Sequence, residues 1–221
     1  MSIETLLVAN RGEIARRIIR TAHRMGIRCT AVYVDADAAS PHVSDADESV
    51  RLSTGYLDGA AIIAAALSTG AQAIHPGYGF LSENARFADA CEAAGIAFIG
   101  PPGSAMRALG DKVSARKLME EAGVPVVPGA NDIDANDVEP ARREAQRIGF
   151  PLLVKAAAGG GGRGIRVVEK LEDLEGAMRA SGAEAATSFG DATIFLERYV
   201  TMARHVEVQI MADAHGEVRA Y

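Results

Sequence analysis

The chain has 221 residues, of which 48% are hydrophobic and 24% are charged, and its formal net charge is −6. This composition predicts a globular protein with one large or two small domains and a substantial core. The acidic balance argues against a nucleic-acid partner and against a polybasic contact with a membrane, because both favour basic surfaces. The most apolar predicted helix is too short to span a bilayer.

The N-terminus and the cysteines indicate a cytoplasmic protein. The first residues lack the basic segment and the long apolar run of a secretory signal. Cys29 and Cys91 stand among apolar or small residues, without the spacing of a metal or redox motif. They predict buried, reduced thiols, which are usual in a reducing compartment.

A strand–helix–strand pattern opens the chain. Thr5–Ala9 is an apolar strand pattern, and a helix is expected to follow, with Asn10 as its N-cap and Glu13 completing a capping box. Gly26 is expected to end this helix, and Cys29–Val34 to form the next strand. The helical spacing predicts one apolar face, made of Ile14, Ile18, Ala22 and Met25.

Strands and helices continue to alternate, which predicts a Rossmann-like parallel sheet. A helix is expected over Tyr56–Thr69 and a strand over Ala71–His75. Ser82 is expected to cap a further helix, and Ile96–Ile99 to form a further strand. A nicotinamide dinucleotide site is not indicated, because only Gly12 stands where that fingerprint needs three glycines.

The loop Pro76–Asn84 follows a strand at its carboxyl end, where open α/β sheets bind ligands. Gly77 and Gly79 are expected to impose unusual turns that leave Tyr78 projecting. His75 is interpreted as a partly buried histidine at the end of a strand, since no partner stands at metal-ligand spacing.

Two lysines have surroundings that suit a bound anion. Lys112 stands in the first turn of a predicted helix, where the helix dipole disfavours a cation unless an anion lies near; a solvated lysine is an equal alternative. Lys155 ends an apolar strand pattern within Leu152–Val168, and a run of glycines follows it. A hairpin with a side-chain-free tip and a lysine at its base describes a mobile flap over a polyphosphate. A glycine-rich linker is the weaker alternative, because strand patterns flank the glycines on both sides.

The remaining residues predict an α+β module and the start of another sheet. Pro128–Val200 is expected to pack helices on one antiparallel sheet, with Ala192–Leu196 as its last strand. His205–Met211 alternates strictly between polar and apolar residues, so a strand is expected there. The turn Asp213–Gly216 is expected to join it to a return strand. Because two strands alone do not form a stable sheet, the sequence is expected to end inside a domain.

Five separated motifs occur in one order along the chain. They are Asn10–Ala15, His75–Asn84, Gly110–Lys112, Lys155 with its glycines, and Arg204–Gln209. The set closely resembles the biotin carboxylase component of biotin-dependent carboxylases, most of all the α subunit of a bacterial acyl-CoA carboxylase.

The resemblance implies an α/β fold in three parts. Residues 1–109 would form the Rossmann-like pre-ATP-grasp domain, residues 110–203 the ATP-grasp lid region, and residues 204–221 the first, incomplete hairpin of the C-terminal ATP-grasp subdomain. The implied activity is that of an ATP-grasp ligase, which uses ATP to activate bicarbonate as carboxyphosphate and then carboxylates biotin on a carrier domain. The implied partners are that carrier domain, a carboxyltransferase subunit and a second copy of the chain, the last through the arginine face around Arg17 and Arg20.

The same resemblance assigns ligand contacts to matching positions. Tyr78 falls where the family approaches the biotin ring, and the main chain of Glu197–Val200 falls at the lid hinge that reads the adenine edge. There the carbonyl of Glu197 and the N–H of Val200 are the expected contacts. The implied ATP contacts are Lys112, Lys155, Gly161, Gly162, Glu197, Arg198, Tyr199, Val200 and His205.

The family's magnesium-binding carboxylates, bicarbonate-binding residues and catalytic base match no position up to Tyr221, so no catalytic or metal-binding residue is assigned. These 221 residues are accordingly expected to be an N-terminal part that does not carboxylate biotin alone. The flap around Gly159–Gly162 is expected to be mobile without nucleotide. The alternatives are a pyruvate carboxylase, another ATP-grasp ligase such as a carbamoyl-phosphate-forming enzyme, and a non-catalytic nucleotide-binding or assembly module.

Overall fold

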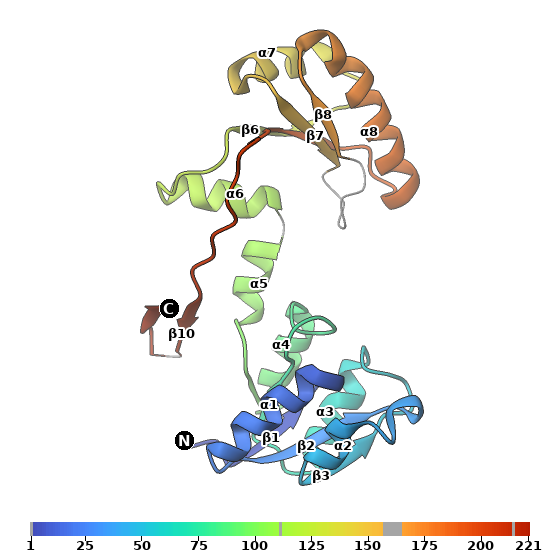
Figure 1. The fold of residues 1–221 in the computed structure, drawn as a ribbon, viewed down its shortest axis with the longest axis vertical. Coiled ribbons are helices and arrows are strands. Elements are labelled where there is room, and N and C mark those ends of the chain that lie inside the picture. The colour runs from blue at the N-terminus through green and yellow to red at the C-terminus, as the bar shows by residue number, and fades with distance from the viewer. Residues whose placement is uncertain (1, 111, 157–164, 214) are drawn as a thin grey trace. The chain divides into compact units, whose positions relative to one another are not determined.

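The computed structural model describes residues 2–110, 112–156, 165–213 and 215–221. Contacts between Cα atoms divide the chain into two compact units, Met1–Ala122 and Gly123–Tyr221. The ribbon in Figure 1 shows the elements of each unit. The two units are described separately below.

The first unit is built on a five-stranded, all-parallel sheet with the strand order β3-β2-β1-β4-β5. Its strands are β1 (Thr5–Val8), β2 (Arg28–Tyr33), β3 (Glu48–Arg51), β4 (Ala73–His75) and β5 (Ala97–Phe98). Its helices are α1 (Gly12–Arg24), α2 (Pro41–Asp45), α3 (Gly59–Ser68), α4 (Ala85–Ala93), α5 (Gly103–Gly110) and α6 (Lys112–Glu121), with a 3-10 turn at Asp35–Asp37. The predicted Rossmann-like sheet is confirmed.

This strand order creates a switch point between β1 and β4. From β1 the chain winds outward through β2 to β3, and it then returns to the other side of β1 as β4 and β5. The loops that follow β1 and β4 therefore diverge over opposite faces of the sheet. In open α/β sheets the crevice between two such loops is the usual place for a ligand.

Both faces of the parallel sheet are covered, because successive side chains of a strand point to opposite sides. In β1, Leu7 belongs to one buried cluster, with Val32, Ile62 and Ile74. Leu6 and Val8 belong to the cluster on the other face, with Cys29 and the inner residues of α1. This double cover explains why the strands read as nearly continuous apolar runs.

Helix α1 buries a different face from the predicted one. Its buried residues are Ala15, Ile19 and Ala22, while Met25 is 69% exposed. Of the predicted set, Ala22 is buried as expected, whereas Ile14 and Ile18 are only partly buried. Small alanines, rather than the largest apolar residues, allow this helix to lie close to the sheet.

Two helix starts also differ from the predictions. Helix α3 begins at Gly59 rather than at Tyr56, and the Asp58 carboxylate caps it by accepting a hydrogen bond from the N–H of Ala61 at 3.0 Å. Helix α4 is capped by Asn84 rather than by Ser82, through the N–H of Phe87 at 3.0 Å. Both caps are side chains of the type that N-cap positions favour.

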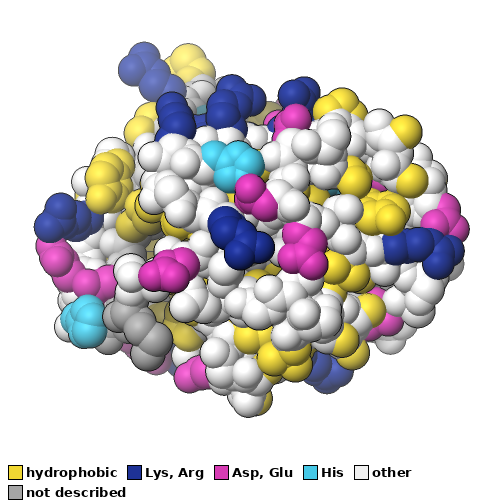
Figure 2. Space-filling model, turned by 90° about the horizontal axis from the view of Figure 1, so that it is seen from below, with side chains coloured by type: hydrophobic (Ala, Val, Ile, Leu, Met, Phe, Trp, Pro, Cys, Tyr) yellow, Lys and Arg dark blue, Asp and Glu magenta, His cyan; other side chains and the backbone are white. Residues whose placement is uncertain are grey.

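Several exposed charged side chains of the first unit form oppositely charged pairs. Arg16 pairs with Asp45, and Arg51 pairs with Asp35. Basic and acidic side chains are accordingly interspersed on the face shown in Figure 2. Such exposed pairs contribute little to the free energy of unfolding.

The second unit contains a four-stranded antiparallel sheet with the order β6-β9-β7-β8. Its strands are β6 (Gly129–Ile133), β7 (Leu152–Ala156), β8 (Arg166–Val168) and β9 (Ile194–Arg198). Helices α7 (Val138–Ile148) and α8 (Leu174–Phe189) pack against this sheet over a shared apolar core, with a 3-10 turn at Leu171–Asp173. The predicted α+β arrangement, including the hairpin of β7 and β8, is confirmed.

The C-terminal residues form a short two-stranded hairpin of β10 (Ile210–Ala212) and β11 (Val218–Ala220). The predicted strand over His205–Met211 was wrong for most of its length, because regular strand structure begins only at Ile210. The described residues from Thr201 onward are all exposed. The part of the alternating pattern before Gln209 has no neighbouring strand among the described residues to complete a ladder.

Cys29 and Cys91 are both free and buried, as predicted. Burial raises the pKa of each thiol to about 11, because a thiolate is costly in apolar surroundings. Within the described ranges, no helix has the length and hydropathy needed to cross a bilayer.

Candidate functional site

In the first unit, one buried amide joins the two loops at the switch point. Asn10, which is fully buried just after β1, donates from Nδ2 to the carbonyl of Pro76 at 2.7 Å and to the carbonyl of Tyr78 at 2.9 Å. Its Oδ1 accepts from the N–H of Arg11 at 2.8 Å. The predicted capping box was therefore wrong. The Asn10 side chain binds the loop that follows β4 (residues 76–84, called the β4 loop below), and Arg11 is the N-cap residue of α1.

Tyr78 projects from the β4 loop as predicted, and its side chain is 65% exposed. Its hydroxyl donates to the carboxylate of Glu13 in the first turn of α1, at 2.6 Å. This hydrogen bond raises the pKa of Tyr78, because a negative charge beside the phenol disfavours the phenolate. Glu13 thus contacts the β4 loop instead of reaching back to its own helix.

The backbone of the β4 loop is strained around Tyr78. Gly77 and Gly79 have φ angles of +64° and +72°, and Phe80 has a φ of +41°. A positive φ is rare for a bulky residue, and it persists only where the surroundings impose it. Here the ring of Phe80 stacks on the ring of Tyr56, with 5.3 Å between the ring centroids. Such strain is typical of loops that carry a function.

A second contact fixes the loop after β1 to the loop after β2. The guanidinium of Arg11 forms two hydrogen bonds to the carboxylate of Asp37, one of them from Nε at 2.6 Å. The hydroxyl of Tyr56 donates to the same carboxylate at 2.7 Å. Asp37 is nearly fully buried and Arg11 is about half-exposed. The guanidinium holds the pKa of Asp37 far below its usual range.

The ion pair of Arg11 and Asp37 makes the free energy of unfolding depend on pH. Because the Asp37 pKa is depressed in the folded state, its contribution is present above the unfolded-state pKa of about 4 and is lost as the pH falls through that value and below it. We expect Asp37→Asn to lower the free energy of unfolding by about 2 kcal/mol at pH 7, with a smaller difference from the unmodified protein at pH 3. Urea unfolding of the variant and of the unmodified protein at both pH values measures these differences in the free energy of unfolding. Asp35→Asn, which breaks the exposed pair with Arg51, is the control and should change stability little. An Asp37→Asn effect that is equal at both pH values would contradict this account.

His75 at the end of β4 behaves as predicted. It is partly buried, and its Nδ1 accepts a hydrogen bond from the N–H of Gly77 at 3.0 Å. Burial lowers the pKa of His75, because the charged imidazolium loses solvation. Its contact supports the same turn that Asn10 holds.

In the second unit, Lys155 lies on the face of the sheet that the helices leave uncovered. Leu152, Val154 and Ala156 alternate with it along β7 and are buried, the first two in the cluster beneath the helices. The Nζ of Lys155 pairs with the carboxylate of Glu197 on β9 and lies 5.7 Å from the ring centroid of Phe195. Lys155 is directly opposite Phe195 in the register, so Glu197 is its diagonal neighbour.

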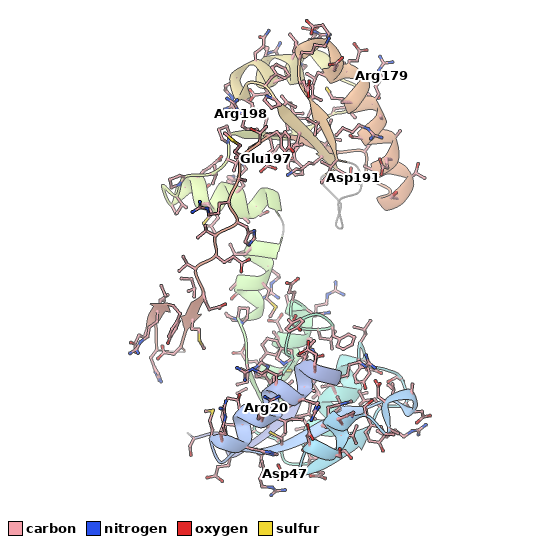
Figure 3. All side chains as sticks on the ribbon, viewed as in Figure 1. Arg20, Asp47, Arg179, Asp191, Glu197 and Arg198 are labelled. Atoms are coloured by element: carbon pink, nitrogen blue, oxygen red, sulfur yellow. The ribbon has the colours of Figure 1, made fainter. Side chains whose placement is uncertain are left out.

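The ion pair of Lys155 and Glu197 is largely enclosed, since each side chain is 23% exposed. Figure 3 labels Glu197 and Arg198 at the end of β9. The predicted need of Lys155 for an anion is met here by a carboxylate of the same unit. Sequence reasoning missed this pairing, because it considered Glu197 only for its main-chain carbonyl.

The other predicted ligand residues are distributed over both units. Lys112 begins α6 in the first unit, whereas Lys155 and Glu197 belong to the second. Arg198 ends β9, and its guanidinium donates to the carbonyl of Phe150 at 3.2 Å. Tyr199 and Val200 follow β9 and are exposed, as is His205, whose ring contacts Glu207 at 2.8 Å. Gly161, Gly162 and the predicted mobile flap lie outside the described residues.

Two family models match consecutive parts of the chain. Residues 2–106 match the biotin carboxylase N-terminal domain, and residues 111–220 match the ATP binding domain of the carbamoyl-phosphate synthase L chain. The first match covers the parallel-sheet unit with its Asn10 and Tyr78 loops. The chain belongs to the biotin carboxylase family.

Curated relatives agree with this family assignment. The α subunit of mitochondrial methylcrotonoyl-CoA carboxylase from Glycine max is 54% identical over 221 residues, which are 98% of this chain and 30% of that protein. The biotin carboxylase of Haemophilus influenzae is 48% identical over 219 residues, which are 97% of this chain and 49% of that protein. The chain thus spans about a third to a half of the length of these relatives.

Solved biotin carboxylase structures have the same fold. The Campylobacter jejuni biotin carboxylase, described as a complex with β,γ-ATP, has a TM-score of 0.87 at 46% identity and covers 99% of this chain and 50% of its own. The biotin carboxylase domain dimer of Hydrogenobacter thermophilus 2-oxoglutarate carboxylase, in complex with MgADP, ADP and bicarbonate, has a TM-score of 0.85 at 43% identity. It covers all of this chain and 49% of its own.

Proposed function

We propose that this chain serves the ATP-dependent carboxylation of carrier-bound biotin, with bicarbonate activated as carboxyphosphate. Support comes from the family membership and from relatives and structures described with ATP analogues, ADP and bicarbonate. The observation within this chain that carries the proposal is Lys155, held on the uncovered face of the second sheet at the base of a glycine-rich hairpin. Phosphoryl transfer depends on positioning and on charge neutralisation, which a lysine in that place supplies.

We further propose the ATP contacts by position. Lys155 and Lys112 would neutralise phosphate charge, and the glycines at 161 and 162 would let backbone N–H groups approach the phosphates. The main chain from Glu197 to Val200 would contact the adenine edge, with Arg198 and Tyr199 in the same hinge and His205 following it. The domain division at residues 109 and 203 is part of this proposal.

Magnesium would be bound together with the phosphates of ATP. Among the side chains that the structure describes, no group of three or more histidines, cysteines, aspartates or glutamates is placed to hold a metal ion. Mg²⁺ needs an octahedral set of oxygen ligands, several of which ATP phosphates and water supply. We propose no magnesium ligand among the described residues.

The proposed partners follow from the same chemistry. A biotin carrier domain would present its ring near Tyr78, and a separate carboxyltransferase subunit would use the carboxylated biotin. A second copy of the chain would dock through α1, whose Arg17 and Arg20 are exposed. Arg20 is labelled in Figure 3. We place the protein in the cytoplasm because of its two reduced thiols, although the plant relatives are described as mitochondrial.

The final acceptor is proposed to be an acyl-CoA. The relatives include methylcrotonoyl-CoA and propionyl-CoA carboxylase α chains, but also a urea amidolyase, and the similar structures include pyruvate carboxylases. The residues that these proteins share with this chain therefore serve several acceptors. The non-catalytic assembly module is the less favoured alternative, because an assembly surface needs no lysine at the base of a glycine-rich hairpin.

The test is a carboxylation assay on the enzyme that contains these residues, with free biotin as acceptor and labelled bicarbonate. We expect ADP release to require both biotin and bicarbonate and to match the label recovered in carboxybiotin. ADP release that is independent of biotin and bicarbonate would favour another ATP-grasp reaction, and a lack of nucleotide binding would favour the assembly module.

A further inference from the structure

Three hydrogen bonds join the segment after β1, which includes Asn10 and Glu13, to the β4 loop. Two come from Asn10 to the carbonyls on either side of Gly77, and one comes from the Tyr78 hydroxyl to Glu13. All of these residues belong to the first unit. The start of α1 thus determines both the path of the β4 loop and the orientation of its projecting side chain.

Both polar atoms of the Asn10 side chain are hydrogen-bonded in this arrangement. Both amide hydrogens are donated to loop carbonyls, and the amide oxygen accepts from the backbone of Arg11. A buried amide satisfied on both ends has one stable orientation, because any rotation leaves polar groups unpaired away from water. Arg11 in turn is held by Asp37, which lies outside the loop that follows β4.

The contact with Glu13 fixes the hydrogen-bonding role of Tyr78. A phenol has a single proton, and here it is donated to a carboxylate, which has no proton to return. Donating this proton uses neither lone pair of the Tyr78 oxygen, so the oxygen can still accept a hydrogen bond. Because Tyr78 is 65% exposed, this acceptor is accessible from solvent on a loop at the carboxyl end of the sheet, where open α/β sheets bind ligands.

We propose that Asn10 and Glu13 are positioning residues that present Tyr78 to the ligand as a hydrogen-bond acceptor. A ligand group that suits it must carry an N–H or O–H donor. If the proposed function holds, that group is an N–H of the ureido ring of biotin. Glu13 and Asn10 themselves do not touch the ligand in this proposal.

The first test measures the pairing without any ligand. Ultraviolet difference titration of the enzyme and its Tyr78→Phe variant isolates the Tyr78 phenol from the other tyrosines. Glu13→Gln, which removes the negative charge, should lower the pKa of Tyr78 toward the ordinary value of about 10. Glu48→Gln, at the amino end of the edge strand β3, removes the same charge elsewhere and should leave the Tyr78 titration unchanged.

The second test measures positioning through steady-state kinetics with free biotin. Glu13→Ala should raise KM for biotin by about threefold to tenfold, which is the range for one hydrogen bond of ordinary strength, while KM for ATP stays the same. Tyr78→Phe should give a similar rise. The double variant should be no worse than either single one, because both act through the same oxygen.

The outcomes separate this inference from the proposed function. An unchanged Tyr78 titration in Glu13→Gln, or additive effects on KM in the double variant, would overturn the inference while biotin carboxylation stands. If the unmodified enzyme shows no response to biotin, the proposed function fails first and the ligand part of the inference fails with it. Glu13 variants lie on the surface, so a loss of folding is not expected to obscure the result.

Discussion

Replacing Lys155 with alanine is expected to raise the Kd for ATP by about tenfold to a hundredfold. Lys155 lies at the end of β7, at the base of the glycine-rich hairpin, and its side chain is mostly enclosed. Water therefore screens its charge only partly. A hydrogen bond to a charged group contributes about 1.5–3 kcal/mol, which corresponds to this range. Calorimetric titration of the enzyme with ATP measures the change. Lys170→Ala, at an exposed position after β8, is the control and should leave the Kd unchanged.

The Glu197 contact needs its own control, because removing Lys155 also leaves a carboxylate without its partner. An unpaired, largely enclosed charge destabilises a fold by itself. The double variant Lys155→Ala with Glu197→Gln removes both charges, so it should recover much of the lost thermal stability. Its Kd for ATP should remain as high as in the single variant. Recovery of ATP affinity together with stability would mean that Lys155 serves only the fold.

Gly77→Ala is expected to lower the free energy of unfolding by about 2–4 kcal/mol, from about 1–2 for a left-handed backbone and the rest for overpacking. Gly77 has a φ of +64°, and a Cβ there would lie 2.6 Å from Cγ2 of Ile14 and 2.8 Å from Nδ2 of Asn10. The added methyl group would therefore displace the amide that holds the loop. Urea unfolding measures the change, and the biotin response should weaken with it.

Gly70→Ala is the matched control for Gly77→Ala. Gly70 has nearly the same backbone conformation, with a φ of +66°, but a Cβ there would have no heavy atom within 4 Å apart from those of its chain neighbours. It should lose only the conformational part, about 1–2 kcal/mol. Equal losses in the two variants would show that the contact between Gly77 and Asn10 does not constrain the loop.

The layout of both sheets was predictable from the sequence because it depends on periodicity. Continuous apolar strands separated by helical patterns require a parallel sheet with both faces covered, and Thr5–Ala9 and Cys29–Val34 show that pattern plainly. Glycines just after helices, such as Gly26, marked helix ends for the same local reason. These signals lie within a few residues of each other, so no tertiary contact is needed to read them.

The polar contacts of the site were less predictable because they join distant residues. Asn10 followed by Glu13 three residues later fits a capping box, yet Asn10 binds carbonyls that lie 66 and 68 residues further along the chain. The pair of Arg11 and Asp37, and that of Lys155 and Glu197, likewise depend on which loops and strands become neighbours. A sequence pattern gives the residue types but not these partners.

The strand expected over His205–Met211 shows that a local pattern can also predict more regular structure than forms. Its alternation is a real sequence signal, but a strand forms only where a neighbour supplies the ladder. In the described residues the ladder reaches from Ala212 back to Gln209, whose carbonyl accepts from the N–H of Tyr221 at 2.9 Å. The alternation alone therefore overestimated the length of this strand.

Lys155 is proposed to contact the phosphates of ATP, and chemical labelling of lysine amines tests this contact most directly. The enzyme would be labelled with and without ATP, and the modified lysines would be quantified by mass spectrometry. ATP should reduce the labelling of Lys155 strongly and leave that of exposed Lys170 unchanged. Equal labelling of Lys155 with and without saturating ATP would contradict the claim.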